Sequence, residues 1–184
     1  MGSSRPTVAT VLLTVLALHS RPLLAAPCES LASLSLPNTT ISAAQLIAAG
    51  SYVAPVPTGR AGTAGRGGAG QGRGNQFADL PAFCRVAASI KPSSDSDIKM
   101  ELWMPVSGWN GKFVLPGNGG FAGAIAPAGL ATNLRNGYAA ATTDTGHEGG
   151  SGAFMMDHPE RLTDFADRAI HETAVKAKAF VAAF

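Results

Sequence analysis

The sequence predicts an α/β protein whose sheet is mostly parallel and is flanked by helices on both sides. From residue 98 onward, segments with the pattern of strands alternate with segments with the pattern of helices, as is typical of parallel sheets. Two glycine-rich loops, at 117–120 and 144–152, each follow directly after a predicted strand. Ligands of α/β sheets bind at the carboxyl ends of the strands. These two loops are therefore the candidate ligand site.

Length and composition limit the classes of protein to consider. The 184 residues are enough for one domain with a sizeable core. The net charge is +2 and only 14% of the residues are charged. The arginines form no dense basic patch and aromatic residues are not interleaved with them, so the composition argues against a nucleic-acid partner.

The N-terminus has the pattern of an export signal. Arg5 provides the positive charge, residues 8–18 form an apolar run, and Ala25-Ala26 supplies small residues for cleavage. The apolar run is too short to span a bilayer of ~30 Å as a helix. We therefore predict a signal peptide over residues 1–26 and a secreted or periplasmic protein with no membrane partner after cleavage.

Export gives the two cysteines a simple interpretation. In an oxidising compartment, an even count of two favours one disulfide between Cys28 and Cys84. A metal site would need further ligands, and none of the four histidines lies at ligand spacing from these cysteines. We expect no metal and no cofactor in this chain.

The N-terminal part is predicted to form an arm over residues 27–57. Residues 29–36 favour a short helical turn, and residues 40–49 fit either a strand or a short helix that ends at Gly50. Residues 51–57 have an extended pattern. The following stretch, 58–76, is rich in glycine and arginine without an apolar anchor, so we expect a flexible loop.

Predicted strands follow at 80–90, 98–104 and 112–115, the second alternating apolar and polar residues. We expect Trp103 and Trp109 to be packing residues.

A helix is predicted at 127–135, with Pro127 in its first turn and Gly137 as its stop. The small apolar run 138–143 is typical of a strand covered on both faces. A long helix is predicted at 164–183, with one apolar face made of Phe165, Ala169, Ile170, Ala174, Ala177, Phe180 and Val181.

Four ordered blocks, at 108–113, 117–120, 141–147 and 168–173, together resemble the tannase and feruloyl esterase family. That family includes the bacterial enzyme that cleaves mono(2-hydroxyethyl) terephthalate. The resemblance covers roughly residues 28–184. It implies an α/β-hydrolase fold and a secreted serine carboxylic-ester hydrolase whose substrates are small-molecule esters of aromatic or phenolic acids.

The resemblance also implies that this chain is a fragment. The family's nucleophilic serine lies in a Gly-Cys-Ser-x-Gly-Gly context, on a strand that follows the long helix, and no Gly-x-Ser-x-Gly pattern occurs here. We expect residues 77–184 to be the N-terminal part of the catalytic domain. The nucleophile strand, the catalytic triad and a lid domain with a possible calcium site would be missing, and the fragment alone would be inactive.

Within this chain the resemblance assigns few site residues. The loop after the third strand supplies one oxyanion donor in α/β-hydrolases, which points to the backbone N–H of Gly119 or Gly120. Cys28 and Cys84 match the family's N-terminal disulfide. We expect His147 to have a structural rather than catalytic role, and Asp144 to orient the glycine loops.

Two other functions remain open from the sequence. One is a non-catalytic secreted module that binds a small anion with the same loops, and the other is an α/β-hydrolase relative with different chemistry.

Overall fold

A computed structural model describes residues 26–55 and 75–184. Nearly all of the predicted signal peptide and of the predicted glycine-rich loop lies outside these described residues. No helix in the described ranges is both long and apolar enough to cross a bilayer.

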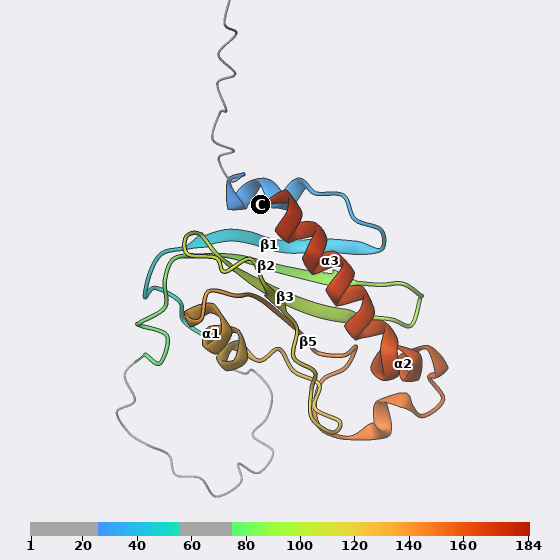
Figure 1. Cartoon of the computed structure of the whole chain (residues 1–184). Helices are drawn as coiled ribbons and strands as arrows, with labels where there is room; N and C mark the ends of the chain where they lie inside the picture. The colour runs from blue at the N-terminus through green and yellow to red at the C-terminus, as the bar shows by residue number, and fades with distance from the viewer. Residues whose placement is uncertain (1–25, 56–74) are drawn as a thin grey trace, which may run out of the picture.

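The core of the structure is one five-stranded sheet with the strand order β1-β2-β3-β5-β4 (Figure 1). The strands are β1 (Thr39–Ile47), β2 (Phe83–Ile90), β3 (Ile98–Pro105), β4 (Phe113–Val114) and β5 (Ala139–Thr143). The ambiguous segment at 40–49 is thus a strand, and it lies at one edge of the sheet. The predicted strand at 112–115 is confirmed only for its two central residues.

The prediction of a mostly parallel sheet is wrong for the described residues. β1 pairs with β2, β2 with β3, and β3 with β5, all antiparallel, and only β4 and β5 are parallel. The connection between β2 and β3 spans only residues 91–97, which is too short for the crossover that parallel neighbours need. A helical crossover separates β4 from β5, and this is where the parallel pair occurs.

Helices cover both faces of the sheet, which confirms the mixed α/β architecture. α1 (Pro127–Arg135) packs on one face and α3 (Ala169–Ala183) on the other (Figure 1). Successive residues of a strand point to opposite faces. Accordingly, Trp103 of β3 packs in a cluster with Leu130 of α1, while Leu102 packs in the cluster that contains Phe180 of α3.

The long helix begins earlier than predicted and contains an irregular turn. It starts at α2 (Pro159–Thr163), continues through the π-helical turn η3 (Asp164–Arg168) and ends with α3. Pro159 suits a first helical turn because its missing N–H has no helical partner there. The buried residues of α3 are Ala169, Thr173, Lys176, Ala177 and Phe180. Three of them, Ala169, Ala177 and Phe180, belong to the predicted apolar face, which is therefore only partly correct.

β5 lies between the two helical layers. All of its residues are buried, as the small apolar run predicts for a strand covered on both faces. Ala139 and Ala141 belong to the cluster on the α3 side, and Ala140 belongs to the cluster on the α1 side. At these three positions the side chain between the strand's backbone and the helical layers is therefore only a methyl group.

The predicted disulfide between Cys28 and Cys84 is present, with a Cα–Cα distance of 5.5 Å. It joins the short 3-10 helix η1 (Cys28–Ser33) to β2. Ala26 N–H donates a 3.0 Å hydrogen bond to the carbonyl of Phe184, so both ends of the described chain lie on the same side of the sheet.

Candidate active site

The two glycine loops lie together at one edge of the sheet. They follow β4 and β5, and because these strands are parallel, their carboxyl ends meet at the same edge. Gly123 and Gly149 exchange backbone hydrogen bonds of 2.7 and 3.1 Å across the loops. Asn118 adds a side-chain link, donating from Nδ2 to the carbonyl of Thr143 at 2.9 Å. The loops therefore form one polar rim.

Gly119 and Gly120 are exposed on this rim. Among the described residues, neither of their N–H groups donates a hydrogen bond to the protein backbone, whereas the Gly119 carbonyl accepts one from Ala122 N–H at 3.1 Å. A Cβ added at either glycine would meet nothing within 4 Å. Gly120 has φ +57°, a conformation that suits glycine. These two N–H groups, which lie on exposed residues and have no hydrogen-bond partner in the described protein, are called the open amides below.

His147 fixes the two loops to each other. Its ring is largely buried, and Nε2 donates to the carbonyl of Phe121 at 2.9 Å. The ring also stacks on Phe154, with a centroid distance of 3.7 Å. A Cβ at Gly123 would overlap the His147 carbonyl and lie 2.7 Å from Nε2, so only glycine fits beneath this ring. These contacts are the structural role predicted for His147.

Asp144 organises the second loop, as the sequence predicts. Its Oδ1 accepts hydrogen bonds from the backbone N–H of Lys99 at 2.9 Å and of Gly146 at 2.8 Å. Only 2% of Asp144 is exposed, and this burial raises the pKa of its carboxyl group to about 6 because the charged form is poorly solvated. Asp144 therefore ties the end of β5 to the start of β3.

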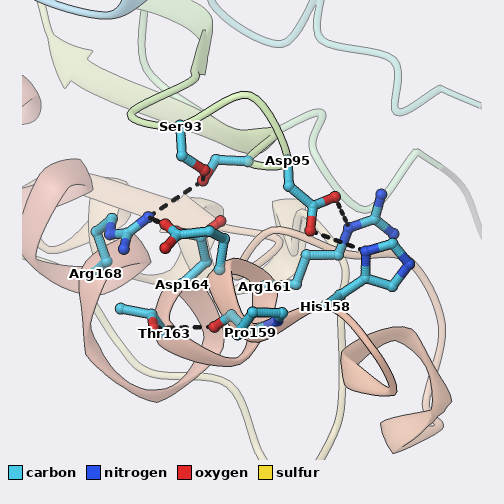
Figure 2. Close-up of polar contacts among 10 residues, drawn as sticks. Ser93, Asp95, His158, Pro159, Arg161, Thr163, Asp164 and Arg168 are labelled. Carbon is cyan, nitrogen blue, oxygen red and sulfur yellow. Dashed lines mark hydrogen bonds and ion pairs between the residues drawn. The ribbon is translucent and has the colours of Figure 1, made fainter.

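A second polar cluster was not predicted from the sequence (Figure 2). Asp95 accepts hydrogen bonds from His158 Nδ1 at 2.9 Å and from Arg161 Nε at 3.0 Å. Asp95 is 63 and 66 positions away from His158 and Arg161, and no local pattern pairs it with them. The acid–histidine contact has the form used in catalytic triads. However, no hydrogen bond in the described part of the chain joins His158 to a serine, threonine or cysteine side chain, so no nucleophile is positioned here.

The same cluster continues along the helix. Arg168 Nη1 lies 3.0 Å from Oδ1 of the fully buried Asp164 and donates to Glu160 Oε2 at 2.7 Å and to Ser96 Oγ at 3.3 Å. Burial raises the pKa of the Asp164 carboxyl group, and Arg168 opposes that effect. The cluster fastens the turn between β2 and β3 to the π-helical turn (Figure 2).

The described ranges contain no group of three or more His, Cys, Asp or Glu residues arranged to hold a metal ion. The small cavity behind the first glycine loop has a volume of ≈ 60 Å³ and is lined by Pro116, Asn118 and Ala141, among others. It has room for a few water molecules. Pockets that enclose small-molecule ligands measure about 300–1,000 Å³, so this cavity is too small to be one of them.

Comparison with known proteins identifies the family of this architecture. The family described as tannase and feruloyl esterase matches residues 84–184, which include all of β2 except Phe83, the strands β3 to β5, both glycine loops and the long helix. The chain belongs to the tannase and feruloyl esterase family.

Individual relatives show how much of their own length this chain spans. An uncharacterized esterase of Xanthomonas campestris is 39% identical over 161 residues, which are 86% of this chain and 25% of that protein. A probable feruloyl esterase B-1 of Aspergillus terreus is 44% identical over 96 residues, 52% of this chain and 18% of that protein. The chain thus spans about a quarter or less of the length of these relatives.

The fold of this region also has a counterpart in a solved structure. The crystal structure of feruloyl esterase B from Aspergillus oryzae aligns with a TM-score of 0.70 and 29% sequence identity. The alignment covers 85% of this chain and 28% of that one.

Proposed function

We propose that this chain is the N-terminal part of an exported serine carboxylic-ester hydrolase that acts on esters of aromatic or phenolic acids, of the feruloyl esterase or tannase type. Residues 1–26 would be a signal peptide, 27–57 an arm, 58–76 a flexible loop, and 77–184 the start of an α/β-hydrolase domain. Family membership and esterase relatives support the reaction class. The observation that carries the proposal is the pair of open amides at Gly119 and Gly120.

These amides suit the charge that develops during ester hydrolysis. When a serine attacks the ester carbonyl, its oxygen becomes an oxyanion, and fixed N–H donors stabilise it. One donor would come from Gly119 or Gly120, and the second from the residue after the nucleophile. His147 and Asn118 hold the loop in place before the substrate binds, so little reorganisation is needed during the reaction.

The sheet order supports a position for the proposed nucleophile strand. β4 is an edge strand among the described strands, with β5 on one side. A further strand laid parallel to β4 on its other side would end at the same rim as Gly119. In the proposed enzyme this strand and its serine elbow come from residues beyond Phe184, together with the triad acid, the triad histidine and a lid. This chain by itself would then lack hydrolytic activity.

The test uses the complete enzyme, expressed from the reading frame that continues past residue 184, with methyl ferulate, methyl gallate and short aryl esters as substrates. We expect hydrolysis through an acyl-enzyme, and Gly119→Val should lower kcat by roughly 100-fold because a branched side chain on the donor residue projects into the open space that the substrate carbonyl needs to reach the N–H. Gly117→Val is the matched control, since it lies in the same loop with equally open space. It should retain activity within a few-fold.

The alternative, a non-catalytic module for small anions, predicts a different result. The complete protein would bind benzoate or phosphate at the rim and would hydrolyse none of the esters. If Gly119→Val hydrolyses the esters as fast as the parent does, the protein is an esterase, but the first glycine loop does not supply the oxyanion donor.

A further inference from the structure

Phe121 is an aromatic residue in an unusual position. It directly follows Gly120, and 46% of it is exposed, although large apolar side chains are generally buried. Consecutive Cα atoms are about 3.8 Å apart, so the Cα of Phe121 lies within about 8 Å of the Cα atoms of Gly119 and Gly120. An exposed aromatic surface therefore borders the site proposed for the oxyanion.

The Phe121 ring is held firmly despite its exposure. It stacks against Phe165 of the π-helical turn, with a centroid distance of 5.5 Å and an interplanar angle of 29°. Its edge lies against Gly152, where a Cβ would be only 3.4 Å from two ring carbons. Its backbone carbonyl accepts the hydrogen bond from His147 Nε2 at 2.9 Å. Backbone and ring are thus both fixed, and one part of the ring remains open.

The supporting residues form a connected aromatic cluster. Phe165 packs edge-on against Phe154 at 5.6 Å, and Phe154 stacks on His147. The cluster joins the first glycine loop, the second glycine loop and the helix. This rigid support distinguishes Phe121 from an apolar side chain that is exposed on a loose loop, because a fixed ring loses little entropy when a ligand binds.

We propose that Phe121 is a specificity-determining residue whose open ring surface receives the aromatic ring of the ester's acyl group. This inference rests on the proposed function. In an ester of an aromatic acid the ring is joined to the carbonyl carbon directly or through a short conjugated link. With the carbonyl oxygen held by the Gly119 or Gly120 amide, our proposal places the acyl ring against Phe121, where aromatic rings stack or pack edge-on with centroids about 4.5–7 Å apart. An acetyl group cannot reach Phe121 in this way.

The experiment compares 4-nitrophenyl benzoate with 4-nitrophenyl acetate, because the two esters share a leaving group and differ only in the acyl group. In the complete enzyme, Phe121→Ala should lower kcat/KM for the benzoate about tenfold and leave the acetate within about twofold. Phe121→Tyr should preserve the preference. Phe121→Leu, which keeps apolar bulk and protects the fold, should lose most of it.

Trp109→Ala is the matched control. Trp109 is also an exposed aromatic residue, at 49%, but it precedes β4 and so lies toward the opposite edge of the sheet. Its substitution should leave the benzoate-to-acetate ratio unchanged.

Each other outcome has a distinct meaning. Equal losses on both esters, together with a lower Tm, would show that Phe121 only packs against other residues and would overturn the inference. An unchanged ratio in Phe121→Ala would overturn it as well. If the parent enzyme hydrolyses neither ester nor the ferulate and gallate esters, the proposed function fails first.

Discussion

The carboxyl group of Asp144 makes stability depend on pH in a direction opposite to that of most aspartates. Its pKa is raised to about 6 by burial, whereas an aspartate in an unfolded chain titrates near about 3.9. The folded state therefore holds the proton more tightly. The contribution of Asp144 to stability is largest below pH ~4 and falls as the pH rises through about 6. A pKa difference of about 2 corresponds to about 3 kcal/mol.

Asp144→Asn should remove this dependence, because the amide keeps an oxygen acceptor for Lys99 and Gly146 but cannot ionise. Between pH 4 and pH 7 the parent should lose up to about 3 kcal/mol of unfolding free energy relative to the variant. Urea unfolding across this range measures the difference. Parallel pH profiles for parent and variant would contradict the prediction.

Asp79→Asn is a control, because Asp79 should change the pH dependence of the unfolding free energy in the opposite direction to Asp144. Hydrogen bonds from Arg135 hold the pKa of Asp79 below its usual value. Its contribution to stability is therefore present at neutral pH and is lost as the pH falls, and its replacement should change the profile in the reverse direction from Asp144→Asn.

At the scale of single elements, one buried ion pair stabilises the π-helical turn of the long helix. Asp164 is fully buried in the π-helical turn, and Arg168 is the cation that faces it at 3.0 Å. Arg168→Ala should lower the free energy of unfolding by about 3 kcal/mol, because a buried carboxylate loses its partner. Adding Asp164→Asn should recover part of that loss, and a double-mutant cycle in urea should give a coupling of about 1 kcal/mol or more.

Arg161→Ala provides the comparison on the same helix. Its ion pair with Asp95 is more exposed to water, so its removal should cost less than about 1 kcal/mol. If Arg168→Ala and Arg161→Ala lower the free energy of unfolding by similar amounts, the burial of Asp164 does not strengthen its ion pair.

Local signals in the sequence were sufficient for several elements. Pro127 and Gly137 bracket α1, and the small residues of β5 indicate a strand between two layers. The apolar pattern of a segment does not show whether the strand pairs parallel or antiparallel, because the pattern indicates a strand without indicating which strand lies beside it. β2 and β3 are antiparallel because only residues 91–97 join them, and the prediction of a mostly parallel sheet did not take the length of this connection into account.

The candidate site was predictable to a similar extent. The glycine loops were found because glycines after a strand are a local pattern, and the chain does bring them together through Gly123 and Gly149. The cluster of Asp95, His158 and Arg161 was missed, since its members come from distant segments whose contact depends on the tertiary fold. Phe121 carried no sequence signal beyond its place next to Gly120.

For the whole molecule, the Cys28–Cys84 disulfide closes a loop with a sequence separation of 56. Replacing both cysteines by alanine should lower the free energy of unfolding by about 4 kcal/mol, mainly because the unfolded chain gains freedom. Urea unfolding of the oxidised parent, the reduced parent and the variant measures this. Reductant should shift the parent toward the variant and leave the variant unaffected. Two alkylatable thiols in the unreduced protein would contradict the bond itself.

The small side chains of β5, which lies between the two helical layers, limit how the ligand preference of such proteins can change. Ala139 and Ala141 face one helical layer and Ala140 faces the other, and all three are essentially inaccessible to solvent. A bulkier side chain at any of them would force a layer outward, because well-packed interiors have almost no spare volume. Substitutions in β5 therefore cannot be used to change the shape of the ligand site. New ligand preferences would have to arise from changes in the rim residues, while the strand beneath stays as it is.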